Sequence, residues 1–501
     1  MNNIKSLPLA TLLVLGSVSN ALAQDYTDAL RYAYLSPTGT ARSMGFGNAL
    51  GSIGGDFSAL SVNPAGIAIY KSSELMFTPS LKLNSVQGDY LSNSVNNNNT
   101  RFNFNNIGIV FTTAQKGRRA AKSPWKSYSF GVGMNRLADF NRDYSYSGSN
   151  YNSSATQAFA ADATYSGNIP ANLETGSLGY FGYQSYLTNY DSAGRAYSSI
   201  VDPTKGVRQL RNVSERGGIN EIVFSFGANY MDQLLLGATL GVPIINYSRN
   251  ATYSESSLTS GTDFNSYSFN DNLTTRGSGI NLKLGLIYKP SDYLRFGLAL
   301  HSPTYYTMHD DYTATLTSNI SSVTTTPVAV DYAPGIDYNL TTPWRAILSA
   351  TGFLGSHGFI TADYEYVDYS SARLHFDPNS SNNASAMESV SNQQIKQLLT
   401  AASNFRVGVE GRVNNFFSVR LGYGYMGSPY KSSAGINTSS NTISGGIGFR
   451  FDHWYLDAGL SHIMYNDVEQ PYPSDLSYAA VPVATLKNSY NNASLTVGFK
   501  F

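Results

Sequence analysis

Apolar and polar residues alternate along most of this chain from Glu74 onward, in segments of roughly ten residues. One segment has apolar side chains at Leu282, Leu284, Leu286 and Tyr288, and a similar segment runs from Leu495 to Phe501. Because successive side chains of a β-strand point to opposite faces, this pattern predicts strands with one apolar and one polar face. The expected fold class is therefore all-β.

Short turns and long polar connections separate the predicted strands in alternation. The short turns include residues 231–233, 289–292, 355–357, 413–415 and 451–453. The long connections are rich in Ser, Asn, Thr and Tyr and cover residues 85–100, 138–218, 247–277, 302–341, 370–403, 427–440 and 466–491. This alternation is typical of a transmembrane antiparallel β-barrel with one periplasmic and one external rim. We count about fourteen strands over residues 74–501, an even number that places both termini in the periplasm.

Residues 1–23 have the layout of a secretory signal peptide. Lys5 precedes an apolar run over residues 7–18, and Ala21-Leu22-Ala23 offers small residues for cleavage after Ala23. The run is too short to span a bilayer as a helix, and no later run of about 18 uninterrupted apolar residues follows. Membrane residence must then come from strands closed into a barrel. We expect the outer membrane of a Gram-negative cell, since the final Phe501 resembles the last-strand signal by which the barrel assembly machinery recognises its clients.

The composition fits this setting. Charged residues make up 13% of the chain, and the 37 Tyr and 25 Phe suit the headgroup depth of a membrane of lipid and lipopolysaccharide. The 45 Gly suit tightly curved strands. The absence of Cys excludes a disulfide framework and a lipid-anchored N-terminus. Equal numbers of basic and acidic residues, 33 of each, give no electrostatic case for nucleic acid.

Charged residues of the predicted strands fall on the face opposite the apolar one. They are expected to point into the lumen, where charge costs less than in lipid. The set comprises Lys283, Arg295, Asp363, Glu365, Arg406, Glu410, Arg412, Arg420 and Asp457. Their mixed signs favour internal pairing, and we interpret them as bracing a plug rather than as a selectivity filter. A separate basic stretch, Lys116, Arg118, Arg119 and Lys122, is interpreted as a solvated turn.

Residues 24–73 break the strand rhythm. A short helix is expected over residues 26–34, ended by Pro37 and Gly39, and Gly-rich punctuation follows before Asn63-Pro64-Ala65-Gly66. A barrel of about fourteen strands encloses a lumen that leaks unless it is blocked. We therefore predict that residues 24–73 form a hatch, meaning a plug of short helices and turns inside the barrel.

Three stretches of this hatch carry a family resemblance, namely residues 40–49, 56–59 and 63–66. They resemble the N-terminal hatch of the FadL/TodX (OMPP1) family of outer-membrane transporters for long-chain fatty acids and other hydrophobic compounds. That family pairs a plug carrying an Asn-Pro-Ala motif with a fourteen-stranded barrel. Weaker similarity extends from residue 285 to the C-terminus.

The resemblance implies passive uptake of a hydrophobic, fatty acid-like ligand. The ligand would enter an apolar pocket between hatch and wall and leave laterally into the membrane. The hatch motif Asn63, Pro64, Ala65 and Gly66 would anchor the hatch near a kink in the third strand. We expect Gly131 or Gly133 to supply that kink; the alternative is that both glycines only ease the curvature of the barrel.

Five apolar hatch residues are the candidate ligand contacts: Met44, Phe46, Leu50, Phe57 and Ile67. The alternative interpretation is that they only pack the hatch. No cofactor or metal is expected, and we expect a monomer. The six His, which are His301, His309, His357, His375, His453 and His462, sit in no recognisable hydrolase motif, so we expect no enzymatic activity.

Two other functions compete with transport. A diffusion porin would need an open, charged constriction, and a hatch argues against it. A surface adhesin or structural barrel stays open as the alternative, because long Tyr- and Ser-rich external loops serve adhesion without any motif.

Overall fold

The computed structural model describes residues 26–36, 38–115, 123–167, 169–331, 335–377, 384–473 and 481–501. The predicted signal peptide, residues 1–23, lies outside the described residues, and so do Lys116, Arg118, Arg119 and Lys122.

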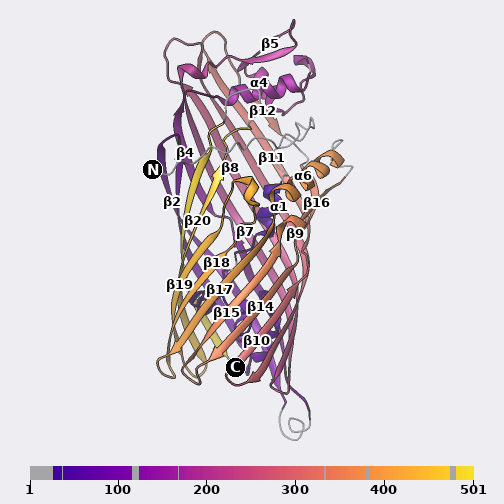
Figure 1. The fold of residues 1–501 in the computed structure, drawn as a ribbon, viewed down its shortest axis with the longest axis vertical. Coiled ribbons are helices and arrows are strands. Elements are labelled where there is room, and N and C mark those ends of the chain that lie inside the picture. The colour runs from indigo at the N-terminus through magenta and orange to yellow at the C-terminus, as the bar shows by residue number, and fades with distance from the viewer. Residues whose placement is uncertain are drawn as a thin grey trace.

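Fourteen antiparallel strands form a closed barrel, as the alternation predicts (Figure 1). Pairing of the first strand with the last closes the wall. The wall strands are β1 Glu74–Tyr90, β2 Asn93–Ala114, β3 Trp125–Asp139, β7 Val207–Tyr230, β8 Leu234–Ser257, β9 Phe264–Ser291, β10 Leu294–His301, β14 Arg345–Phe353, β15 Gly358–Asp368, β17 Ala401–Arg412, β18 Phe417–Met426, β19 Ser440–Arg450, β20 Trp454–Glu469 and β21 Ala484–Lys500. The all-β fold with an N-terminal hatch is thereby confirmed.

The strands extend well into most of the predicted long connections, which is a correction to their bounds. Residues 85–100 are a continuous hairpin of β1 and β2, turning at Leu91 and Ser92, where both φ angles are positive. Four further strands prolong the wall: β4 Arg142–Asn150, β11 Tyr305–Ile320, β13 Ile336–Thr341 and β16 Arg373–Phe376, while β12 Val328–Asp331 pairs with β11. Outside lipid the outer face need not be apolar, so the alternation fades while the backbone ladder continues.

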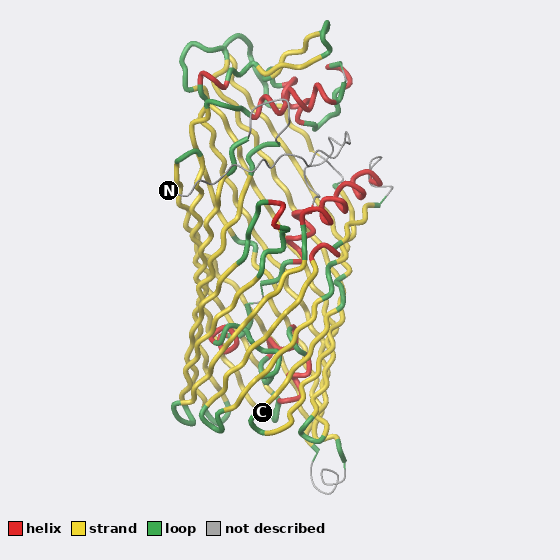
Figure 2. Tube along the Cα trace, viewed as in Figure 1, coloured by secondary structure: helices red, strands yellow, loops and turns green. Residues whose placement is uncertain are grey.

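Short turns lie at one end of the barrel and the long connections at the other, and we name these the turn end and the loop end (Figure 1). The loop end carries α4 Ala155–Tyr165, η3 Pro170–Asn172, α5 Leu178–Gln184, β5 Thr188–Asp191, β6 Ala196–Ser199, η4 Pro203–Lys205, η5 Tyr369–Ser371, α6 Ala384–Leu398 and η6 Ser432–Ala434. The hatch consists of α1 Tyr26–Ala33, α2 Ala41–Gly45, η1 Phe57–Ser61 and η2 Pro64–Ile69, inside the lumen (Figure 2). None of the described helices is long and apolar enough to cross a membrane.

The phase of the alternation places side chains as predicted. Leu284, Leu298, Val407 and Leu421 are exposed on the outer wall. Lys283, Asp363, Glu365, Arg406, Glu410, Arg420 and Asp457 are buried in the lumen. Leu421 is 71% exposed and Asp457 is 0% exposed, so the two faces are cleanly separated. Arg412 also lines the lumen, in the cavity at the turn end, but it is exposed.

The largest apolar cluster fills the lumen towards the loop end. It includes Tyr32 of α1, Phe159 of α4, Phe181 of α5 and Ile395 of α6, together with aromatic residues of β8, β9 and β11. Ring pairs such as Phe181 and Phe269, with centroids 5.2 Å apart and an interplanar angle of 80°, meet edge to face. This cluster therefore forms an apolar, aromatic part of the interior that reaches down to the first helix of the hatch, beside buried ion pairs such as Arg211 with Asp271.

Candidate functional site

Polar caps set the shape of the hatch. Thr40 accepts a hydrogen bond from the Ser43 amide and starts α2, and Asp56 accepts one from the Ser58 amide and starts η1. The Thr40 hydroxyl also donates to Asp56 Oδ2 at 2.6 Å. Two elements that are separate in sequence are thus fastened to each other, which makes the hatch a compact body.

A belt of glycines on the inner wall receives the hatch. Several of them face each other across strand pairs, as Gly108 and Gly133, Gly227 and Gly237, Gly237 and Gly285, Gly408 and Gly422, and Gly446 and Gly459 do. A methyl group on Gly133 would lie 2.5 Å from Phe57 Cζ, and one on Gly131 would lie 2.8 Å from Ile67 Cδ1. Side chains at this level would occupy the space of the hatch, so its fit explains part of the high glycine content.

The hatch motif docks on β8 and β9. Asn63 caps η2 by accepting the Ala65 amide at 3.1 Å, and its Nδ2 donates to Gly51 O at 2.6 Å and to Leu286 O of β9 at 3.2 Å. A side chain on Gly285 would collide with Asn63 Oδ1. Asn63 therefore ties the hatch both to itself and to the wall.

The resemblance placed this motif near the third strand, and here the structure differs. Pro64 and Ala65 lie against Gly237 and Gly285, whereas the motif's neighbour Ile67 reaches Gly131 of β3 and Gly227 of β7. Gly66 packs inside the hatch, where a methyl group would lie 2.9 Å from both Ala59 Cβ and Gly54 Cα. A 3₁₀ turn advances the chain so quickly that successive residues reach different strands.

The five candidate ligand contacts are all buried, but they do not share one pocket. Phe46 and Leu50 pack with Ile53, Ala299, Ile347 and Phe359. Phe57 and Ile67 pack with Leu60, Tyr70, Met76, Val110 and Val223. Met44 lines a separate small cavity beside β17–β21. Each buried side chain of this size contributes roughly 1.5–3 kcal/mol to holding the hatch in place.

The wall has a seam on the loop-end side of the hatch. The backbone ladder between β2 and β3 ends at the pair Asn106 and Asn135. Beyond this pair, residues 93–105 of β2 pair only with β1, and β4 pairs only with β7. Phe102 and Phe104 lie next to this opening on the outer face and are 61% and 43% exposed, so the seam begins within the apolar outer surface.

Side chains rather than backbone groups bridge the seam. Asn97 Oδ1 accepts hydrogen bonds from the Ser145 amide at 2.9 Å and from the Ser145 hydroxyl at 2.8 Å. Asn93 Nδ2 donates to Ser147 O at 2.9 Å, and Asn99 donates to Asp143. Hydrogen bonds of this kind contribute about 0.5–1.5 kcal/mol each, and no backbone ladder joins β2 to β4 here.

The hatch is hydrogen-bonded to Asn106 of β2 and Asn135 of β3, the last backbone-paired residues before the seam. Asn135 Nδ2 donates to the Ser61 hydroxyl at 2.9 Å, and Asn106 Nδ2 donates to the Ser58 hydroxyl at 3.3 Å. The stretch that joins α1 to α2 holds β3 further towards the loop end, where the Ser36 amide donates to Leu137 O at 3.1 Å. A displacement of the hatch would therefore release both edges of the seam.

The irregularity of the third strand is not at the predicted glycines. Pairing of β3 with β2 and β7 runs unbroken through Gly131 and Gly133, and the register shifts instead between Arg136 and Ala138. Gly131 and Gly133 therefore carry no bulge, and a kink of the strand at these glycines stays a prediction. Their missing side chains make room for Phe57, Leu60 and Ile67, which requires no bend in the strand.

Charged residues of the lumen brace the hatch, as interpreted from the sequence. Arg42 of α2 pairs with Glu410 at 3.0 Å, and Arg420 joins Glu410 to Asp457 with two contacts of 2.7 Å. The Gly51 amide donates to Asp363 at 2.9 Å, and Arg295 donates to Ile53 O at 2.9 Å. His301, which no sequence motif singled out, lies 2.8 Å from Val62 O through Nε2.

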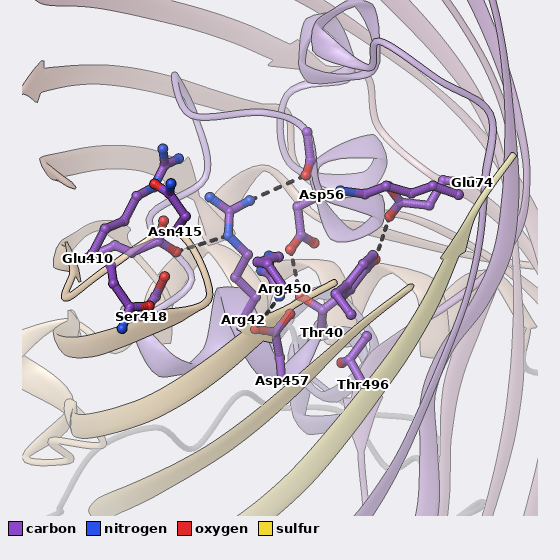
Figure 3. A pocket seen from close by; sticks show the side chains of 15 residues that line it. Thr40, Arg42, Asp56, Glu74, Glu410, Asn415, Ser418, Arg450, Asp457 and Thr496 are labelled. Carbon is purple, nitrogen blue, oxygen red and sulfur yellow. Dashed lines mark hydrogen bonds and ion pairs between the residues drawn. The ribbon is translucent and has the colours of Figure 1, made fainter. Parts of the chain in front are cut away.

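A cavity of about 450 Å³ opens beneath α2 at the turn end (Figure 3). Its lining includes Arg42, Glu74, Glu410, Arg450 and Asp457, so this space between hatch and wall is polar and charged rather than apolar. Within the described ranges, no group of three or more His, Asp or Glu side chains is arranged to hold a metal ion. The apolar side chains expected to contact a hydrophobic ligand gather instead towards the loop end, where Leu137 and Ala138 at the seam join the large cluster around α1.

The glycine belt gives a direct test of hatch docking. Gly285→Val is expected to expel the motif from β9, because overpacking a tight contact costs about 1–3 kcal/mol. The measurement is limited proteolysis of the hatch in the detergent-purified protein. Gly352→Val is the matched control, since nothing lies within 4 Å of a Cβ there. Equal protease resistance of the two variants would contradict the docking geometry.

The family model described as outer membrane protein transport protein (OMPP1/FadL/TodX) matches residues 220–501, which is more than half of the chain. No curated protein matches the sequence.

Solved structures show the same fold at low identity. A Pseudomonas aeruginosa FadL homologue is 12% identical with a TM-score of 0.56, and the match covers 94% of this chain and 100% of that one. The Pseudomonas putida toluene transporter TodX is 12% identical with a TM-score of 0.53, covering 94% and 100%. The Ralstonia pickettii toluene transporter TbuX is 16% identical with a TM-score of 0.51, covering 92% and 98%. The family model and the shared fold together show that the chain belongs to the outer membrane protein transport protein family (OMPP1/FadL/TodX).

Proposed function

We propose that this protein takes up hydrophobic molecules such as long-chain fatty acids across the outer membrane of a Gram-negative cell, and that it releases them laterally through the seam between β2 and β4, just beyond the end of the ladder between β2 and β3. The observation that carries the proposal is the apolar cluster that runs from the loop helices to Leu137 and Ala138 at the seam. A hydrophobic solute gains about 25 cal/mol for each Å² of apolar surface that leaves water. An apolar lumen therefore offers such a solute a favourable path.

The proposed orientation places the loop end outside the cell and the turn end, with both termini, in the periplasm. The loop helices then meet the lipopolysaccharide layer, and the seam faces the membrane above the hatch. We also propose that the protein is a monomer and that its last strand, ending at Phe501, is read by the barrel assembly machinery. The descriptions of related structures as toluene transporters extend the candidate solutes to small aromatic hydrocarbons.

Transport would be passive. The solute enters among the aromatic residues of the loop end, because hydrophobic contacts with these residues are non-directional and tolerate solutes of different shapes. It reaches α1 and the Ser36–Leu137 contact. A shift of the hatch then breaks the hydrogen bonds that hold Asn106 and Asn135 to the hatch. The solute then passes between β2 and β4 into the membrane, driven by its own gradient.

Substitutions in the hatch motif test this function. Asn63→Ala removes three hydrogen bonds, one of them a cap worth about 0.5–2 kcal/mol, and is expected to abolish uptake of a labelled long-chain fatty acid. Pro64→Ala is expected to abolish uptake as well, by loosening the turn, while the barrel still assembles. Uptake by whole cells is the measurement, and heat-modifiable migration of the protein reports assembly. Normal uptake by both assembled variants would refute a gating role for the motif.

A further inference from the structure

Two cavities lie on opposite sides of the short helix α2, against the same five strands β17 to β21. The turn-end cavity has a volume of about 450 Å³, and the cavity towards the loop end has about 60 Å³. Thr40 and Arg42 of the α2 region line the first, and Met44, Gly47 and Asn48 line the second. One five-residue helix and the residues after it therefore separate two spaces in the lumen.

The strands pass both cavities in the same order. On β20, Asp457 lines the turn-end cavity, Gly459 meets α2, and Ser461 lines the other cavity. On β17 the corresponding residues are Glu410, Gly408 and Arg406. The inward-facing positions of β18, β19 and β21 repeat this order. The cavities are thus successive along the barrel axis, at one side of the lumen.

Backbone contacts at the middle level form the separation. A methyl group on Gly459 would lie 2.5 Å from Ala41 O, and one on Gly45 would lie 3.2 Å from Gly446 Cα. Gly408 and Gly422 meet the backbone of Phe46 and Gly47 just as closely. Glycine backbone forms much of the wall at this level, and two wall hydroxyls also hold α2: the Ala41 amide donates to Thr496 Oγ1 at 2.7 Å, and the Ser444 hydroxyl donates to Gly45 O at 3.5 Å.

The larger cavity is lined mainly by polar groups, and the smaller one has both polar and apolar side chains in its lining. Arg406 and Asn492 line the smaller one, and Asn492 Oδ1 is buried without a hydrogen-bond partner. In the larger one Asp457 is fully buried, and its Oδ2 also lacks a partner. Buried polar atoms without partners are costly, and a hydrated solute or water passing through would satisfy them. The charged lining of the larger cavity is the opposite of what a hydrophobic solute requires.

We propose that these cavities are two parts of a polar route through the barrel, which passes small hydrophilic solutes to the turn end when α2 moves. The ion pair of Arg42 with Glu410 holds α2 against β17 at the larger cavity, and we call this ion pair the latch of the route. The route lies along β17 to β21, whereas the proposed hydrophobic exit lies between β2 and β4. It is a second conduction function that does not depend on the first.

A reversible lock on α2 tests the route. The natural chain contains no Cys, so Gly45→Cys with Gly446→Cys introduces the only pair, at positions where a Cβ on each residue would lie 3.2 Å from the Cα of the other. The assay is swelling of liposomes carrying the purified protein in isotonic glycine, with the cross-link verified by mass spectrometry. We expect the oxidised protein to lose glycine flux to the level of protein-free liposomes and to recover it after reduction.

A second variant guards against a lock that distorts the barrel. Arg42→Met removes the latch without a cross-link and is expected to raise glycine flux above the wild-type value. Glycine flux that is the same in the wild type, the oxidised pair and Arg42→Met would overturn the proposal. Loss or retention of fatty acid uptake in the seam and hatch-motif variants tests the proposed function and has no bearing on this polar route.

Discussion

Closing the seam with a disulfide is expected to abolish hydrophobic uptake. Asn97→Cys with Ser145→Cys places the cross-link where a side-chain oxygen now bridges β2 and β4 at 2.8 Å. A covalent bond at this point prevents the strands from parting, while the loops, the hatch and the wall stay in place. Uptake of labelled fatty acid should fall to background in oxidised cells and return on reduction.

A matched pair on an unbroken ladder controls for oxidation. Thr252 and Asn270 face each other between β8 and β9, also near the loop end, and their side chains meet at 2.7 Å. A disulfide from Thr252→Cys with Asn270→Cys should leave uptake unchanged, because the backbone ladder already holds these strands together. If both cross-links had the same effect, or neither had any, the seam would not be the exit.

Removing the hatch is expected to turn the barrel into an open pore. Deletion of residues 24–61 should leave the barrel assembled, since the strand ladders alone close the wall. The lumen of a fourteen-stranded barrel is wide enough to leak once it is emptied, and charges such as Glu410 and Asp363 would then face water. Single-channel conductance in planar bilayers should rise sharply, and fatty acid uptake should be lost.

An assembled deletion variant that neither leaks nor loses fatty acid uptake would contradict this expectation and show that the hatch is not the gate. An adhesive or structural role would then describe the protein better. Heat-modifiable migration must be checked first, because a misassembled barrel would also fail to take up the tracer.

The sequence predicted the barrel because lipid imposes a strong pattern on it. Outward residues such as Leu284 and Leu421 must be apolar, and lumen residues such as Arg420 need not be, so strand number and phase follow from alternation. Beyond the membrane this constraint ends. Residues 85–100 keep their ladder but lose the apolar face, which is why they were predicted as a loop.

The functional site was less accessible from sequence. The hatch motif was recognised through the resemblance, but its strand partners were not, since a 3₁₀ turn distributes neighbours over several strands. The seam depends on where a ladder between distant segments ends, and Asn106, Asn135, Ser58 and Ser61 are ordinary polar residues in sequence. The glycine belt left a signal in the composition, but glycine has several uses in strands and the count alone does not separate them.

The central claim is that this barrel conducts hydrophobic molecules, and one uptake measurement tests it most directly. The full-length protein is expressed in a Gram-negative strain that lacks its own long-chain fatty acid transporter, and the initial rate of labelled fatty acid uptake is recorded. We expect uptake well above that of the strain with an empty vector, and no such gain with the assembled Asn63→Ala variant. Uptake by the assembled wild-type protein that equals the empty-vector rate would contradict the account.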